Sequence, residues 1–202
     1  KGVIFKSGKP GNFIAGADIK EMMDMNEDQA VQFAKRGQSV FHEINLLKIP
    51  VIAAVHGRAL AGGCGLATAC DIVLATKSAR FGYPEVKIGF VAAIVMAILR
   101  RNLSEKRAFE LITRGFEFDT TTAEIFGLIN EIFDDETFEE NVQNYVSGYQ
   151  KISRSAVILS KRLLYQMDGM DFETALQSGV DVNAIARMTK DCQNGIARFL
   201  QK

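Results

Sequence analysis

Apolar and polar positions alternate in two different patterns along the first half of the chain. Residues 2–5 form a short apolar run that ends in the turn sequence SGKPG, which predicts a strand followed by a loop. Within residues 28–48, apolar positions recur at spacings of three and four, which predicts a helix with one buried stripe. Pro50 ends this helix and opens VIAAVHG, a nearly continuous apolar run typical of a strand buried on both faces.

The alternation continues to about residue 101 and is then replaced by helical patterns. A short helix over about 66–69 precedes the strand pattern DIVLAT, a short strand and turn in ARFGYPEVKIGF, and a helix over 91–101. The helices expected after this point, interrupted by strand-like LINEIF, span residues 104–114, 121–127, 137–152, 155–167 and 172–201. Strands that alternate with helices predict an α/β fold with a largely parallel sheet, here followed by a helical C-terminal extension.

Composition narrows the class of protein. The chain has 202 residues, of which 48% are hydrophobic, enough for one domain with a substantial core. Its 24 basic and 24 acidic residues balance, which argues against a general nucleic-acid binder. No apolar run reaches membrane length, and we expect no membrane partner.

The few cysteines and histidines point to a reducing compartment and to no metal site. Cys64, Cys70 and Cys192 lack metal-ligand spacing, and three cysteines leave one unpaired in any disulfide scheme. We therefore expect reduced thiols and a cytoplasmic location. The chain begins at Lys1, not at Met, and already within a strand pattern, so we expect further residues before it.

The stretch ALAGGCGLATACD (residues 59–71) places three glycines where a strand pattern gives way to a helix pattern. Glycine weakens a helix, so its presence here needs a reason. One reason is close packing of the helix on the sheet. The other is an exposed backbone amide near Gly62 that donates to an anion or oxyanion, for which the loop IAGAD (residues 14–18) could supply a second donor. Spacing alone leaves both readings open.

Glu85 is the candidate acid, because it lies in the otherwise apolar segment FGYPEVKIGF. If its carboxyl points inward, desolvation raises its pKa toward the range useful for proton transfer. A solvent-facing glutamate on an edge strand is the alternative. Asp71 is expected to be a strand-start or loop acid held by backbone amides, and Cys64 a small buried residue in preference to a nucleophile. Three basic residues, Lys20, Lys161 and Arg162, are possible phosphate ligands.

Three blocks of the sequence together resemble the enoyl-CoA hydratase/isomerase family, the crotonase superfamily. They are FIAGADIKEM, IPVIAAVHGRALAGGCGLATACDIVLAT and ARFGYPEVKIGF, in that family's order and spacing. AEIFGLINEIF and the C-terminal DCQNGIARFLQK extend the similarity over essentially the whole chain. The family's N-terminal strand region is not in this sequence.

The resemblance implies a core of ββα spiral units over residues 1–133 and a helical oligomerisation region over 134–202, assembled as a homotrimer or a dimer of trimers. It implies an acyl-CoA thioester substrate, with no cofactor beyond the coenzyme A of that substrate. Backbone amides of Ala17 and Gly62 would hold the thioester oxygen, and Glu85 would exchange a proton at the α-carbon. The residues expected to border the substrate are Ala15, Ala17, Asp18, Ile19, Lys20, Gly62, Gly63, Gly65 and Lys161.

One departure from the family pattern bears on the choice between reactions and leaves three readings open. Two-glutamate hydratases of the family carry their first glutamate where this chain has Gly65, and glycine cannot orient or deprotonate a water. Hydration by Glu85 alone is the first reading, since the blocks are similar to a methylglutaconyl-CoA hydratase-type branch in which some members share this glycine. A Δ3-Δ2 enoyl-CoA isomerase, which needs one base and no water, is the second. A non-catalytic scaffold is the third.

The space above Gly65 is the feature that separates the first two readings. If Met96 or Phe90 fills it, no water can be held opposite Glu85, and hydration is disfavoured. Rossmann-type dinucleotide binding is a further alternative, but the chain lacks G-x-G-x-x-G after its first strand and has no Walker lysine.

Overall fold

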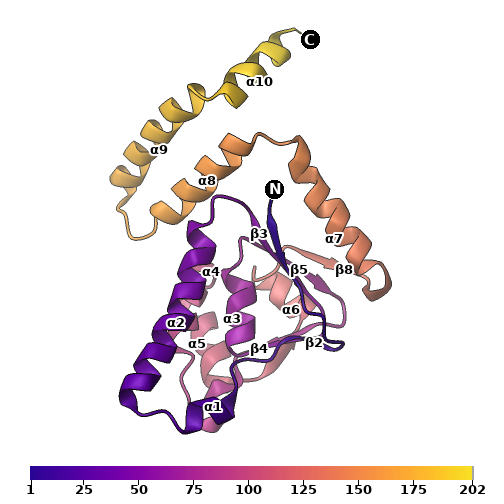
Figure 1. Ribbon diagram of the computed structural model, residues 1–202, viewed down its shortest axis with the longest axis vertical. Coiled ribbons are helices and arrows are strands. Elements are labelled where there is room, and N and C mark those ends of the chain that lie inside the picture. Colours follow the sequence, from indigo (N-terminus) through magenta and orange to yellow (C-terminus); the bar gives the residue numbers. More distant parts are fainter. Residues whose placement is uncertain (202) are drawn as a thin grey trace.

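Successive pairs of strands contribute one strand each to two four-stranded sheets (Figure 1). The computed structural model describes residues 1–201. The first sheet is parallel throughout, in the order β1 (Val3–Phe5), β3 (Val51–Val55), β5 (Ile72–Thr76) and β8 (Glu131–Phe133). The second has the order β2 (Asn12–Ile14), β4 (Arg58–Leu60), β6 (Arg80–Gly82) and β7 (Glu117–Asp119), and only its β6–β7 pair is antiparallel.

Helices follow each pair of strands, which produces the expected ββα spiral. The helices of the core are α1 (Ile19–Met23), α2 (Glu27–Leu46), α3 (Gly62–Ala69), α4 (Ala93–Asn102), α5 (Glu105–Arg114) and α6 (Thr120–Ile125), with the 3-10 segment η1 (Pro84–Ile88). The C-terminal part contains η2 (Asp135–Thr137), α7 (Phe138–Ser147), η3 (Gly148–Lys151), α8 (Arg154–Gln166), α9 (Phe172–Arg187) and α10 (Lys190–Leu200).

The predicted α/β class is confirmed, with two sheets where the sequence pattern indicated one. The strands that the pattern did not show, β2, β4 and β7, are three residues long, too short to establish a periodicity. All residues of β3 and β5 are buried, as their continuous apolar runs predict. The corner helix begins at Gly62, four residues earlier than expected, so its glycines lie within its first turn.

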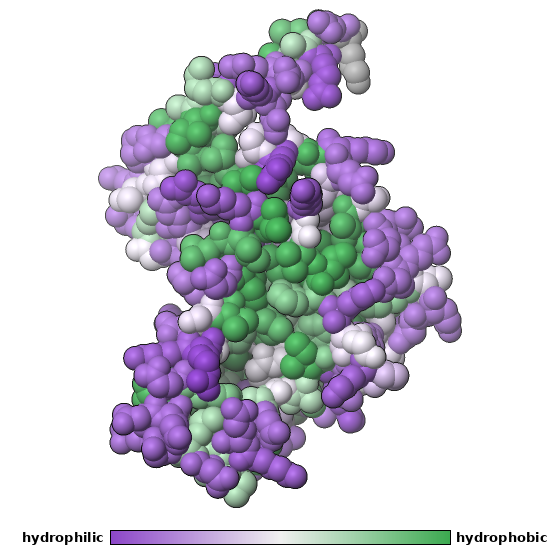
Figure 2. Space-filling model, in the orientation of Figure 1, coloured by the Kyte–Doolittle hydropathy of each residue, from purple (hydrophilic) through white to green (hydrophobic). Residues whose placement is uncertain are grey.

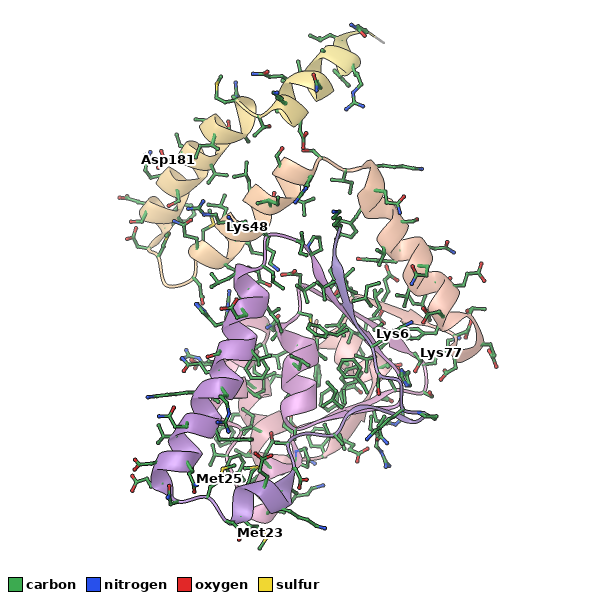
Figure 3. All side chains as sticks on the ribbon, in the orientation of Figure 1. Lys6, Met23, Met25, Lys48, Lys77 and Asp181 are labelled. Atoms are coloured by element: carbon green, nitrogen blue, oxygen red, sulfur yellow. The ribbon has the colours of Figure 1, made fainter. Side chains whose placement is uncertain are left out.

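Helix α7 belongs to the packed core, although it lies beyond the expected boundary between residues 133 and 134. Phe138 and Val142 pack with Ile52 and Leu74 of the first sheet. Two ion pairs also tie this region to the ends of β1 and β5: Lys6 to Glu139 at 2.9 Å and Lys77 to Asp134 at 2.5 Å. Both lysines lie on the α7 side of the molecule (Figure 3). In contrast, α9 and α10 lie against α8, away from both sheets (Figure 1).

Candidate active site

Two loops meet at the carboxyl end of the second sheet. Residues 15–17 follow β2 and residues 61–62 follow β4, and these parallel strands are neighbours. Gly16 has a φ of +103°, and a Cβ placed on it would lie 3.0 Å from the Cβ of Ala61 and 3.9 Å from the amide nitrogen of Gly62. Because only glycine adopts this conformation readily, Gly16 lets the two loops approach closely. The two predicted oxyanion-binding loops are therefore brought together.

Helix α3 begins with amides that have no partner in its own first turn. Its first intrahelical bond runs from the Gly65 amide to the Ala61 carbonyl at 3.0 Å, and no side chain of residues 1–201 caps the helix. Among residues 1–201, no acceptor is assigned to the amide of Gly62 or to that of Ala17. Ala61, which precedes the helix, has a φ of 52°, a strained conformation for a residue with a side chain. The arrangement leaves donors available for an oxyanion.

The two roles that spacing alone left open, close packing and an exposed backbone amide, belong to different glycines of the corner. A Cβ on Gly63 would overlap the carbonyl oxygen of Ile14 and lie 2.7 Å from its Cβ, so Gly63 allows α3 to pack on β2. A Cβ on Gly62 would meet no atom of the described part of the chain within 4 Å. Packing thus explains Gly63, whereas the space around Gly62 suits the approach of a ligand to its amide.

Gly65, one turn along α3, faces Val95 of α4. A Cβ on Gly65 would overlap Cγ2 of Val95 and lie 3.3 Å from Cγ1. Val95 is 4% exposed, whereas Met96 and Phe90, the two residues considered from the sequence, are 37% and 50% exposed. The space above Gly65 is therefore filled, but by Val95.

Glu85 is half-buried in η1, where Pro84 starts the segment and Gly89 ends it in a left-handed conformation. Its Oε2 atom is buried and has no hydrogen-bond partner within residues 1–201. Desolvation raises the pKa of Glu85 above its ordinary value, which favours the protonated form. Of the two alternatives that the sequence left open for Glu85, the buried oxygen, without a partner in the described residues, favours the inward one.

A buried polar contact links the segment that carries Glu85 to helix α3. The Tyr83 hydroxyl lies 3.0 Å from Oγ1 of Thr68, which donates to the Cys64 carbonyl at 2.9 Å. Tyr83 immediately precedes η1 and Thr68 lies on α3, so this contact joins the segment of Glu85 to the helix of Gly62. Burial raises the pKa of Cys64 to about 12, which makes it a poor nucleophile, in agreement with its predicted structural role.

Lys161 does not occupy the predicted position of a substrate ligand. Its ammonium group donates to the Ile44 carbonyl (2.8 Å), the Ile49 carbonyl (3.1 Å) and Oδ2 of Asp71 (2.7 Å), and the residue is 9% exposed. These three acceptors use all three of its N–H groups. The structure therefore contradicts a contact between Lys161 and a CoA phosphate. Asp71 also accepts from the Val51 amide at 2.7 Å, which confirms the prediction that a backbone amide holds it.

The other residues predicted to border the substrate, in and after the loop of residues 15–17, lie at the surface. Ala15, Ala17, Ile19 and Lys20 are exposed, and Asp18 caps α1 by accepting from the Lys20 amide at 2.9 Å. The methionine-containing tip between α1 and α2 lies beyond them, marked by Met23 and Met25 in Figure 3. Sequence reasoning missed Val95 and the Tyr83–Thr68 contact, because neither carries a local signal.

Over residues 1–201, no cluster of three or more histidine, cysteine or acidic side chains is arranged to hold a metal ion. No helix in that range has the length and apolar character needed to cross a membrane.

Comparison with known proteins gives the same family over the whole chain. The model of the enoyl-CoA hydratase/isomerase family matches residues 1–202. A putative enoyl-CoA hydratase of Thermus thermophilus is 35% identical over 199 residues, which cover 97% of this chain and 79% of that protein. The short-chain-enoyl-CoA hydratase of Clostridium acetobutylicum is 32% identical, with 99% and 77% covered.

Solved structures agree with the sequence matches. The enoyl-CoA hydratase of Mycobacterium smegmatis superposes with a TM-score of 0.95 at 30% identity, covering 100% of this chain and 78% of that one. Human enoyl coenzyme A hydratase domain-containing protein 3 superposes with a TM-score of 0.94 at 28% identity, covering 100% and 79%. The chain belongs to the enoyl-CoA hydratase/isomerase family and has its crotonase fold.

Proposed function

We propose that this protein binds an enoyl-CoA thioester and uses Glu85 as its single acid/base. The backbone amides of Ala17 and Gly62 hold the thioester oxygen, where negative charge develops as an enolate forms. The observation that carries the proposal is the buried, unpartnered Oε2 of Glu85, in a site whose two donor loops converge. Ala15, Asp18, Ile19, Lys20, Gly63 and Gly65 border the substrate in this proposal.

Hydration of the α,β double bond is the reaction we place first. The water oxygen bonds to the β-carbon and one proton is added to the α-carbon. Protonated Glu85 gives its proton to the α-carbon while its other oxygen takes one from the water. The carboxyl of Glu85 is therefore protonated again at the end of the reaction. The raised pKa of Glu85 supports the protonated starting form. The names of relatives, such as the crotonyl-CoA hydratase of Syntrophomonas wolfei (32% identical), support hydration.

Δ3-Δ2 isomerisation is the second candidate, and the contact between Gly65 and Val95 favours it. Val95, in place of the expected Met96 or Phe90, fills the space over Gly65, which counts against a water held there. In this reaction ionised Glu85 takes a proton from the α-carbon, the double bond moves, and the same proton is returned to the γ-carbon. No water is consumed. A non-catalytic acyl-CoA-binding protein is the third candidate, and the unpartnered carboxyl argues against it.

We also propose that the protein assembles with copies of itself as a homotrimer or dimer of trimers. Apolar side chains are exposed along α8, α9 and α10: Leu164, Phe172, Leu176, Val180, Ile185, Met188, Ile196, Phe199 and Leu200. Figure 2 shows hydrophobic surface on these helices and in the middle of the same face. Such an extent of exposed apolar surface is typical of an interface. Light scattering after gel filtration tests the assembly.

The reaction is tested with three substrates and two matched variants. Crotonyl-CoA and 3-methylglutaconyl-CoA report hydration by loss of the conjugated-enoyl absorbance, and 3-hexenoyl-CoA reports isomerisation by its gain. Glu85→Gln should lower the activity that the wild type shows by about 10²-fold or more. Glu124→Gln, an exposed glutamate on α6, should change nothing. Turnover that survives Glu85→Gln would refute the proposal, and binding without turnover in the wild type would establish the third candidate.

A further inference from the structure

Val95 is a buried apolar residue that stands directly against the helix bearing the proposed oxyanion donor. It lies on α4, is 4% exposed, and contacts α3 at Gly65. Gly65 and Gly62 are three residues apart on α3, so they share one face of the helix. Cys64, next to Gly65, is close enough to Glu85 for that carboxyl to help raise its pKa. Val95 therefore packs against α3 one turn from Gly62, beside the residue that lies close to Glu85.

The contact is tight, and the residue that makes it is stiff. A Cβ on Gly65 would overlap one methyl group of Val95 and lie within 3.4 Å of two more carbon atoms. A β-branched side chain in a helix has one strongly preferred rotamer, so Val95 has little freedom to turn away. Position 65 consequently has no room for a side chain. A water there would also lack polar partners on the α4 side, since Val95 offers only methyl groups.

We propose that Val95 is a specificity-determining residue, which keeps water and any side chain out of the space over Gly65, so that the only water available for hydration is one that Glu85 itself holds. This inference rests on the proposed function and deepens it. It places the ratio of hydration to isomerisation under the control of one side chain on α4, a helix that carries none of the proposed catalytic groups. Opening that space should admit a water and shift the ratio toward hydration.

The contact itself is tested by stability, independently of any activity. Gly65→Ala is compared in the wild type and in Val95→Ala, with unfolding followed in urea. The destabilisation caused by Gly65→Ala should largely disappear when Val95 is shortened, because the two sites are in contact. Equal destabilisation in both backgrounds would overturn the steric part of the inference.

The effect on specificity is tested with crotonyl-CoA and 3-hexenoyl-CoA. Val95→Ala should raise the ratio of hydration to isomerisation by about fivefold or more, since an ordered water can be held at small cost. Val95→Thr keeps the volume of the side chain, adds a hydroxyl that can hold a water, and should shift the ratio in the same direction. Val142→Ala is the matched control, because Val142 is equally buried (2% exposed) but lies on α7 and packs against the first sheet.

Each outcome has a distinct meaning. A raised ratio in both Val95 variants, with an unchanged ratio in Val142→Ala, supports the inference. Unchanged ratios in an active Val95→Thr enzyme would overturn it, even if Val95→Ala fails to fold. A wild type that turns over neither substrate would overturn the proposed function, and this inference with it, whatever the stability measurements show about the contact.

Discussion

The ammonium nitrogen of Lys161 on α8 lies 2.7 Å from Oδ2 of Asp71, at the start of β5. Oδ1 of the same carboxylate accepts from the Tyr165 hydroxyl, also at 2.7 Å. Both members of the ion pair are largely buried, with side-chain exposures of 8% and 16%. Asp71 therefore joins the C-terminal helical region to the core, at the end of α3 opposite Gly62.

Lys161→Met should destabilise the protein by about 3 kcal/mol, because removal of one partner leaves a buried carboxylate without its countercharge. Urea unfolding measures the loss. Lys106→Met, which removes an exposed lysine on α5, should cost well under 1 kcal/mol in the same experiment. Folded Lys161→Met should keep the KM of the wild type for its CoA substrate. A large rise in KM would show that Lys161 binds the substrate after all.

Alanine at the two corner glycines should have opposite consequences. Gly62→Ala places its Cβ in open space and should be neutral, or stabilising by up to about 1 kcal/mol as helix propensity predicts. Gly63→Ala drives its Cβ into the Ile14 carbonyl and should destabilise by about 1–3 kcal/mol. Thermal unfolding of the pair measures the difference. Equal effects would mean that α3 shifts freely on β2.

The sequence predicted the parts of the site that are local in the chain. The resemblance identified Glu85 and the two loops, whereas the apolar segment around Glu85 left open whether its carboxyl points inward or toward solvent. The sequence could not separate the role of Gly62 from that of Gly63, because the distinction depends on a contact with Ile14, about fifty residues earlier in the chain. Contacts between residues that are distant in the sequence decide whether a corner glycine serves packing or ligand binding.

Lys161 shows the same limit more sharply. A lysine on an amphipathic helix is normally solvent-exposed, and phosphate binding was a reasonable prediction for it. Its burial depends on acceptors at Ile44, Ile49 and Asp71, which only the folded chain brings together. Val95 was missed for an equivalent reason, since nothing in an apolar helix pattern marks the one residue that meets Gly65.

The pH dependence of activity should distinguish the two reactions. Desolvation raises the pKa of Glu85, so its carboxyl stays protonated to higher pH than in the unfolded chain. Hydration starts from the protonated form, so its kcat/KM should fall as pH rises through that pKa. Isomerisation starts from the carboxylate and should rise over the same interval. Rate profiles for both substrates between about pH 4 and pH 9 decide between them.

The same pKa shift has a consequence for stability. Between the unfolded and the raised folded pKa, the native state binds more protons than the unfolded chain, so the free energy of unfolding decreases as pH rises through this interval. Glu85→Gln removes this contribution. The variant should therefore gain stability relative to the wild type on going from acid to neutral pH. A difference in stability that is constant with pH would contradict the raised pKa.

Tyr83→Phe tests whether the contact between η1 and α3 positions Glu85 against the oxyanion donors. The change removes only the hydroxyl that lies 3.0 Å from Thr68, and Thr68 keeps its bond to the Cys64 carbonyl. If the contact holds Glu85 in register with the Gly62 amide, kcat should fall by about tenfold while KM stays within about twofold, because small displacements act on the transition state more than on binding. Tyr145→Phe, on α7, is the matched control and should leave both constants unchanged. A loss of stability in Tyr83→Phe with an unchanged kcat would show that the hydroxyl serves folding alone.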